Sequence, residues 1–265
     1  MNILLKHGKR ARHGRGISLL IPFRAEEDSP RFRAFEWTIR YYASHLPGAE
    51  IIVGTDDSLP FSKTKAFNHA RERATGDVLV LIDADCYIDT DVLLHCAKEI
   101  RRERKRGYRL WYIPYRRFYR LTEEATRRVL KSNPRDPLRF PTPPSEKDTE
   151  AHSSASRGHW WGALIQVMPS EAYDMVGGCD PRFRGWGGED VAFMRAVDTL
   201  YCKHKTTRNQ VLHLWHPMIK TEWNLRMWDG QLSAKDNDRL ANRYYAAFGD
   251  PKRMRNLVGE YREVE

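Results

Sequence analysis

Acidic residues in one short segment have the types and spacing of a metal site. Asp83 and Asp85 are two residues apart and directly follow the apolar run Val78–Ile82. Two carboxylates this close repel each other unless a cation lies between them, and Asp83 begins in a region of low dielectric constant. A divalent metal ion is the simplest solution. A helix N-cap with one extra acidic residue is the alternative that needs no metal.

Two histidines late in the chain are candidates for further ligands of that metal. His213 and His216 are three residues apart, and imidazole beside carboxylate favours Mn²⁺ or a later transition metal over Ca²⁺. Residues three apart on a straight strand point to opposite faces, so both can bind one ion only if the chain bends between them. Pro217 favours a strand end at this point. One surface histidine and one core histidine is the alternative.

The segment Gly-Trp-Gly-Gly-Glu-Asp at 185–190 combines flexibility, an aromatic wall and two acids. Its glycines permit a tight turn and a close approach of the backbone to a ligand. Glu189 and Asp190 would then begin a helix, whose dipole stabilises negative charge. Such a carboxylate can act as a general base or hold hydroxyl groups, and Trp186 offers a flat surface to a sugar ring. An acidic first turn after a glycine loop is the alternative without function.

Alternating strand and helix patterns predict how these residues come together. Strands are predicted at 17–23, 49–57 and 77–85, with helices at 29–46 and 63–74 between them. This alternation is typical of an α/β fold with a mostly parallel central sheet flanked by helices. Ligands of such sheets bind at the carboxyl ends of the strands, where Asp56, Asp83 and Asp85 fall.

The rest of the chain is predicted as one domain with a flexible basic arm. The arm is 1–16, and the domain, 17–265, has a nucleotide-binding half, 17–107, and an acceptor-binding half, 108–265. The elements predicted in the second part are a helix at 90–106, a strand or hairpin at 108–121, a helix capped by Thr122, a mobile loop at 133–158, a strand at 159–169, helices around 170–178 and 189–201, and a strand at 209–217.

Positive charge is concentrated in two segments of a chain whose net charge is +10. Residues 1–16 carry five Lys and Arg and no acid, and residues 101–140 carry fourteen against four. A concentrated basic segment with interleaved aromatic residues fits a polyanion, such as DNA or an acidic polysaccharide. A solvated helix face with a disordered tail explains it equally well.

The cysteines and the hydropathy pattern predict a cytoplasmic protein without a membrane span. Four cysteines show no Cys-x-x-Cys spacing, and the basic N-terminus is not followed by the apolar core of a secretory signal. The longest apolar run is too short to cross a bilayer. We therefore expect reduced thiols, with a Cys179–Cys202 disulfide left open.

Taken together, the order of five motifs resembles the metal-dependent inverting glycosyltransferases of the GT-A fold. The nearest likeness is to the β-1,4-galactosyltransferase group and its chondroitin-polymerase-like and family 2 relatives. It covers residues 17–217, and "GWGGED" after an Asp-x-Asp motif is specific, whereas Asp-x-Asp alone is weak. The motifs are "IPFR" (21–24), "FSKTKAFN" (61–68), "LIDAD" (81–85), "GWGGED" (185–190) and "HLWH" (213–216).

The resemblance implies a role for each matching residue. Asp190 would be the catalytic base, and Asp85 would bind the metal with His216. His213 falls where galactosyltransferases carry a methionine ligand, so this chain would use two imidazoles. This chain departs from those enzymes in Val191, which replaces a third acid, and in its basic segment. The residues expected to bind donor or acceptor are Pro22, Phe23, Arg24, Asp56, Phe61, Lys63, Lys65, Asn68, Asp83, Trp161, Gly162, Trp186, Gly187, Gly188 and Glu189.

The implied activity is the transfer of a hexose or N-acetylhexosamine from a UDP-sugar to an acceptor hydroxyl, on a Rossmann-like GT-A fold with Mn²⁺ or Mg²⁺. A glycan or protein acceptor is favoured, and hydroxymethylated DNA is the other candidate. A metal-dependent phosphoesterase is an alternative function, but it would more naturally hold two metals and gives "GWGGED" no role. A non-catalytic nucleic-acid-binding protein explains the basic segment and leaves the acids idle.

Overall fold

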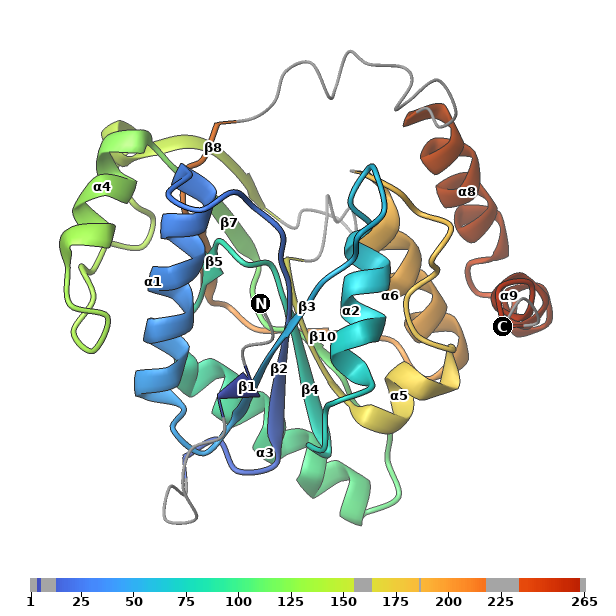
Figure 1. Ribbon diagram of the computed structural model, residues 1–265. Helices are drawn as coiled ribbons and strands as arrows, with labels where there is room; N and C mark the ends of the chain where they lie inside the picture. The colour runs from blue at the N-terminus through green and yellow to red at the C-terminus, as the bar shows by residue number, and fades with distance from the viewer. Residues whose placement is uncertain (1–3, 6–12, 155–163, 186, 218–233, 263–265) are drawn as a thin grey trace.

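A seven-stranded sheet between helices forms the body of the protein in the computed structural model, which describes residues 4–5, 13–154, 164–185, 187–217 and 234–262. Figure 1 shows α1 (Pro30–His45) and α2 (Lys63–Arg71) on opposite sides of the central strands. From one edge to the other the strands are β1 (Leu4–Leu5), β3 (Glu50–Gly54), β2 (Ile17–Pro22), β4 (Val78–Ile82), β9 (Ile165–Pro169), β6 (Tyr112–Ile113) and β10 (Lys205–Thr206).

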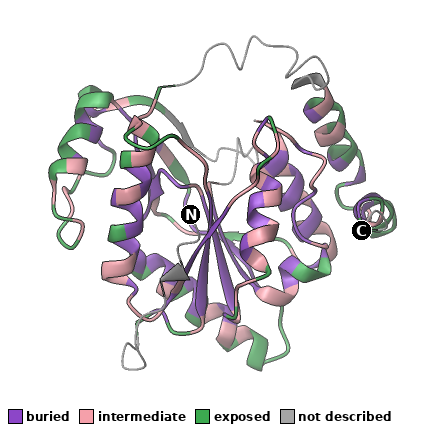
Figure 2. Ribbon diagram, in the orientation of Figure 1, coloured by how far each residue is buried: buried purple, intermediate pink, exposed green. Residues whose placement is uncertain are grey.

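The central strands are apolar along their length because helices cover both faces of the sheet. Every residue of β2 and β4 is buried, and Figure 2 shows these central strands in the buried colour. Strand β2 runs parallel to β3 and β4, and β10 runs parallel to β6, whereas β9 is antiparallel to its neighbours β4 and β6. The predicted α/β fold with a central sheet flanked by helices is therefore confirmed, but the sheet is mixed rather than mostly parallel, because β1–β3, β4–β9 and β6–β9 are antiparallel pairs. The carboxyl ends of β2, β3 and β4 meet at one edge.

The helices begin where the sequence supplies a cap. Ser29 accepts a hydrogen bond from the backbone of Phe32, and Ser62 does the same for Lys65. A Cβ at Gly54 would lie 1.8 Å from the Ala66 carbonyl oxygen, so only glycine lets α2 pack so closely on β3. The helices around the sheet are α1 (Pro30–His45), α2 (Lys63–Arg71), α3 (Thr90–Lys105), α5 (Ser170–Met175) and α6 (Glu189–Leu200).

A second, four-stranded sheet lies beside the first and carries half of the candidate site. Its order is β5 (Cys86–Tyr87), β11 (Gln210–His213), β7 (Arg117–Leu121) and β8 (Thr149–Ser154). The α4 helix (Glu123–Lys131) starts at Thr122, as expected. Two expectations differ. The segment 108–121 is divided between the two sheets, and the expected loop 133–158 contains a 3₁₀ helix (Glu146–Asp148) and β8, whose polar sequence hides it.

Residues 234–262, the part of the chain after residue 217 that the structure describes, form two helices that the sequence did not predict, α8 (Ala234–Ala247) and α9 (Pro251–Gly259). At the other end of the chain, Leu4–Leu5 of the basic arm 1–16 forms β1 and pairs with β3. All four cysteines are free, so Cys179 and Cys202 form no disulfide. Among the described residues, no helix is both long and apolar enough to cross a membrane.

Candidate active site

Asp85, His213 and His216 come together at the junction of the two sheets. Antiparallel pairing of β5 with β11 sets His213 opposite Cys86, and the Leu214 amide donates to the Asp85 carbonyl at 2.8 Å. Asp85 Oδ1 lies 3.4 Å from His213 Nε2, and Asp85 Oδ2 lies 3.3 Å from His216 Nε2. Because β11 ends at His213, the chain bends there, and both imidazoles reach the same carboxylate.

The donor atoms of this cluster suit one metal ion. All three ligand atoms lie within 4.8 Å of one another. Two atoms that each lie about 2.1 Å from an ion are themselves roughly 3.0–3.4 Å apart, which agrees with the separations found. His216 Nδ1 lies 3.0 Å from the Pro217 carbonyl oxygen, so it carries the proton and leaves the Nε2 lone pair toward Asp85.

The charge states of the cluster also suit a cation. Burial lowers the pKa of His213 to about 4, so its imidazole is neutral near pH 7 and has a lone pair to give. Burial opposes the charge of Asp85, but the imidazoles when protonated at low pH, together with Arg31, outweigh it and hold the pKa of Asp85 well below its usual range. Asp85 is therefore an anion that no hydrogen bond satisfies at Oδ2. An ionised ligand with neutral imidazoles is what a divalent metal requires.

Asp83 has different partners, although only one residue separates it from Asp85. The chain turns after β4, where the Cys86 amide donates to the Asp83 carbonyl at 3.1 Å, so the two side chains do not continue one strand face. Lys63 Nζ lies 2.7 Å from Asp83 Oδ1 and 3.4 Å from Glu189 Oε1. One lysine at the start of α2 thus bridges the Asp-x-Asp segment and the "GWGGED" segment.

Burial governs the ionisation of this second cluster. It raises the pKa of both Asp83 and Glu189, and Lys63 works against that rise. Burial likewise opposes the charge of Lys63, but the two carboxylates hold its pKa well above the ordinary value. Lys63 is therefore the cation that keeps two buried acids together in the described part of the chain.

The "GWGGED" segment forms the expected tight entry into α6. Gly188 is the N-cap residue with φ +83°, and Glu189 Oε2 accepts a hydrogen bond from the Gly187 amide at 3.0 Å. Asp190 is half-buried, and it lines a small cavity together with Lys63, Gln166 and Glu189. The predicted base thus faces a recess beside the Lys63 cluster.

At the end of β2, Arg24 and Phe61, two of the residues expected to bind the nucleotide, lie against each other. The Arg24 guanidinium donates to the carbonyls of Asp56 and Ser58 at 3.1 and 2.9 Å and lies 5.2 Å from the centre of the Phe61 ring. Phe23 and Arg24 line a cavity here, and Phe23 stacks on Phe35 at 3.8 Å. The Asp56 carboxylate accepts from the Ser62 amide at 3.0 Å, so it shapes this loop.

Other predicted site residues lie elsewhere or play supporting parts. The Asn68 amide accepts from the Cys179 amide and donates to the Cys179 carbonyl at 2.9 and 2.8 Å, so it fixes the segment before "GWGGED". Pro22 is buried in β2, and Lys65 is half-buried on α2. Trp161, Gly162 and Trp186 lie outside the described residues.

Two arginines at the metal cluster escaped sequence reasoning. Arg31 Nε lies 3.6 Å from Asp85 Oδ2, and Arg120 donates to the His216 carbonyl at 3.0 Å. Arg120 belongs to the basic segment 101–140, where no feature of the sequence distinguishes it from the other basic residues. Seven arginines of 101–140 form ion pairs, which are Arg101, Arg102, Arg104, Arg106, Arg120, Arg127 and Arg128. Much of this basic segment is thus neutralised within the fold.

A family comparison bears on the same residues. Residues 58–155 match the sequence model of glycosyl transferase family 2, and this stretch contains Lys63, Asp83 and Asp85. Over these residues the chain is similar to glycosyl transferase family 2. The glycosyltransferase expected from the motifs is therefore confirmed. No curated protein sequence matches the chain.

Solved structures of three glycosyltransferases are similar to this one. A Drosophila β-1,4-galactosyltransferase 7 in complex with xylobiose is 14% identical, with 88% of this chain and 80% of that chain covered and a TM-score of 0.46. The mannosyltransferase PcManGT of Pyrobaculum calidifontis, with GDP-Man and Mn²⁺, is 11% identical, with 96% and 75% covered and a TM-score of 0.45. GalNAc-T7, with UDP, GalNAc and Mn²⁺, is 14% identical, with 96% and 55% covered and a TM-score of 0.47.

Proposed function

We propose that this glycosyltransferase is metal-dependent and inverting, and that it moves a hexose or N-acetylhexosamine from a UDP-sugar to an acceptor hydroxyl. The observation that carries the proposal is the convergence of Asp85, His213 and His216 on one point beside the Lys63 cluster. The family match over 58–155 contains the Asp-x-Asp part of this arrangement but neither histidine. The histidines are thus an independent support.

Asp85, His213 and His216 would hold the divalent ion, Mn²⁺ by the choice of ligands. Such an ion neutralises charge that develops on a departing diphosphate. Lys63 pairs with Asp83 and Glu189 at its side of the recess, where Asp83 would bind the donor ribose and Glu189 would bind sugar hydroxyls. Arg24, Phe23 and Phe61 would form the nucleotide end of the site.

Asp190 is the base of the proposed reaction. Its carboxylate would accept the proton of the acceptor hydroxyl while that oxygen forms a bond to the anomeric carbon. The bond from that carbon to the diphosphate oxygen breaks, and the electron pair leaves with UDP. Attack opposite the leaving group inverts the configuration, so an α-linked donor gives a β-linked product. Asp190 lies in the first turn of α6, where the helix dipole favours a negative charge.

A glycan or protein acceptor is favoured over hydroxymethylated DNA. DNA binding relies on Lys and Arg that neutralise phosphates. Seven arginines of the basic segment instead pair with acids of the protein itself. The phosphoesterase alternative is also weaker, because the described residues supply one group of metal ligands and such enzymes use two metals.

The test is release of free nucleotide from a panel of UDP-, GDP-, CMP- and TDP-sugars, with Mn²⁺ and with EDTA. We expect release from one UDP-sugar that needs the metal, is stimulated by a glycan or protein acceptor, and is lost in Asp190→Asn. Asp174→Asn is the matched control, because that carboxylate pairs with Arg71 on the protein surface. Full activity in Asp190→Asn would contradict the assignment of Asp190 as the base. Activity unaffected by EDTA would contradict the metal dependence.

A further inference from the structure

The segment that leads into Glu189 and Asp190 is held from one side by the start of α2. The Ser62 hydroxyl donates to the Phe183 carbonyl at 2.9 Å, and the Gly185 amide donates to the Phe61 carbonyl at 3.1 Å. Ser62 also begins the helix that carries Lys63. The segment and the lysine of the acid cluster therefore share one support.

The same segment is held from its other side by α8. The Asn237 side chain donates from Nδ2 to the Arg184 carbonyl at 2.8 Å and accepts at Oδ1 from the Arg184 amide at 3.2 Å. Asn237 is 6% exposed, so water does not replace these bonds easily. One amide side chain thus satisfies both backbone groups of Arg184, as a neighbouring strand would.

A third contact joins α8 directly to the first residue before Glu189. A Cβ built on Gly188 would lie 2.9 Å from the Ala241 Cβ. Gly188 has φ +83° and is the N-cap of α6, so the two helices meet where the acidic turn begins. Any residue larger than alanine at position 241 must push against this cap.

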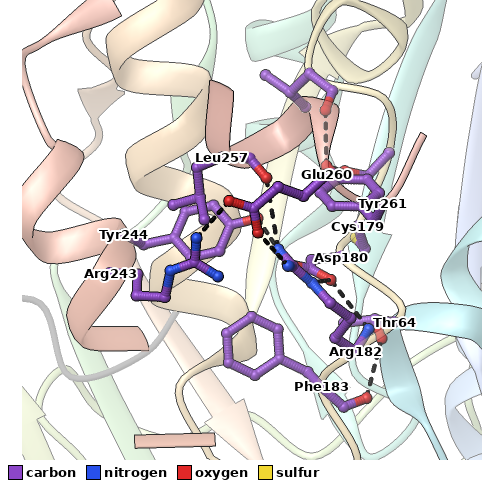
Figure 3. Close-up of polar contacts among 12 residues, drawn as sticks. Thr64, Cys179, Asp180, Arg182, Phe183, Arg243, Tyr244, Leu257, Glu260 and Tyr261 are labelled. Carbon is purple, nitrogen blue, oxygen red and sulfur yellow. Dashed lines mark hydrogen bonds and ion pairs between the residues drawn. The ribbon is translucent and has the colours of Figure 1, made fainter. Parts of the chain in front are cut away.

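Ion pairs fasten α8 and α9 to the beginning of the segment (Figure 3). Arg182 binds the buried Asp180 carboxylate at 2.7 Å and Glu260 at 2.6 Å. The Tyr244 hydroxyl on α8 donates to the same Asp180 carboxylate at 2.9 Å, and Arg243 pairs with Glu260. The two C-terminal helices are therefore bound to the segment at Asp180, Arg184 and Gly188.

We propose that α8 positions the acidic turn for catalysis, with Asn237 as the positioning residue and Ala241 as the spacer. Asn237 contacts the segment through both backbone groups of Arg184, so its effect on the acidic turn passes through that backbone. A shift of about 1 Å in a reacting group can cost roughly 100-fold in rate. This proposal rests on the proposed function, and it places a requirement for activity well beyond the residues of the family match.

The first test compares Asn237→Ala with Asn242→Ala, an exposed asparagine on the same helix. For Asn237→Ala we expect kcat with the UDP-sugar to fall roughly 10- to 100-fold, while KM for the donor and the affinity for Mn²⁺ alone stay within about threefold. Hydrogen exchange of the peptide 183–190 should accelerate. Asn237→Asp, which keeps the acceptor oxygen, should recover part of kcat. Asn242→Ala should match the wild type in every readout.

The second test leaves every hydrogen bond in place. Ala241→Val should lower kcat and leave Mn²⁺ affinity unchanged, whereas Ala246→Val at an exposed position should change neither. The positioning role is contradicted if kcat stays at the wild-type value in both Asn237→Ala and Ala241→Val, or if the loss of kcat comes with a raised donor KM and a lowered Mn²⁺ affinity. If the wild type transfers no sugar, the proposed function is refuted. If hydrogen exchange is still faster in Asn237→Ala than in the wild type, the structural support of the segment by α8 is retained.

Discussion

The two carboxylates of the Asp-x-Asp segment occupy opposite electrostatic environments. Asp85 faces His213 and His216, and its pKa is held well below the usual range. Asp83 faces Lys63, and burial raises its pKa. A single turn after β4 separates them. Neighbouring acids in one motif can therefore serve two tasks, because the elements that pack against each one differ.

The partners of the two acids explain the division of labour. The imidazole of His213 is neutral near pH 7, and Arg31 is half-exposed, so the charge of Asp85 is available to a metal ion. The ammonium of Lys63 stays with the protein and compensates Asp83 and Glu189 at all times. We propose that the first cluster binds the metal ion and that the second holds the reacting centre in place.

The largest expected effect concerns the metal side. His216→Ala should lower metal-dependent sugar transfer by about 1,000-fold or more, because it removes a direct ligand and with it the neutralisation of the diphosphate. Nucleotide release at saturating Mn²⁺ measures this. His95→Ala, an exposed histidine on α3, should retain full activity. Retention of activity in His216→Ala would break the assignment of this side to the metal.

The next effect concerns the permanent cation. Lys63→Met should lower the free energy of unfolding by about 3–5 kcal/mol, because it leaves two buried carboxylates unpaired. Urea unfolding of the variant and of the exposed control Lys98→Met measures this. A loss below about 1 kcal/mol, the value of a surface pair, would show that Asp83 and Glu189 do not depend on Lys63.

The deficit of Lys63→Met should shrink as the pH falls. Burial raises the folded-state pKa of Glu189 above its unfolded value, and removal of Lys63 raises it further. A group with a raised folded pKa stabilises the fold at low pH and loses this contribution as the pH rises through that value. Unfolding curves at a series of pH values test the sign. A deficit that grows on acidification would contradict it.

Asp83→Asn should have an intermediate effect. We expect a roughly 10- to 100-fold loss of transfer from a misplaced donor, with the fold retained because Lys63 still pairs with Glu189. Steady-state kinetics measure the loss, and a melting curve checks the fold. A loss as large as that of His216→Ala would mean that the two acids share one role.

The smallest effect sharpens the contrast between the two cations. Arg31→Met should change stability by less than about 1 kcal/mol, because its side chain is 53% exposed. The affinity for Mn²⁺ should rise a few-fold, because a competing positive charge is removed. Arg40→Met on the same helix, with a side chain 71% exposed, is the control. A large loss of stability would show that Arg31 acts on Asp85 as Lys63 acts on Asp83.

The sequence predicted the strands that carry the acids better than it predicted the partners of those acids. Short apolar runs such as Val78–Ile82 are typical of strands buried on both faces, so the sequence predicted β2, β3 and β4. The bend at His213 was indicated by Pro217. Strand β8 was not predicted because its residues are polar. Helices α8 and α9 lie beyond the last of the five motifs, so no motif marked them.

The missed contacts depend on pairings between distant segments. Arg120 meets the His216 backbone across 96 residues, and Asn237 meets Arg184 across 53. No local spacing marks either residue. Lys63 was expected near the nucleotide, but its bridge between Asp83 and Glu189 depends on how α2 and α6 pack together.

Binding of Mn²⁺ by the wild type, Asp83→Asn and Asp85→Asn is the most direct test of the division between the two acids. Electron paramagnetic resonance of the free ion gives the affinity of each, with circular dichroism to show that each is folded. We predict that Asp83→Asn binds within about threefold of the wild type and that Asp85→Asn loses more than about 100-fold, since even outer-shell partners cost 10- to 100-fold. Equal losses in the two variants, or no binding by the wild type, would contradict the account.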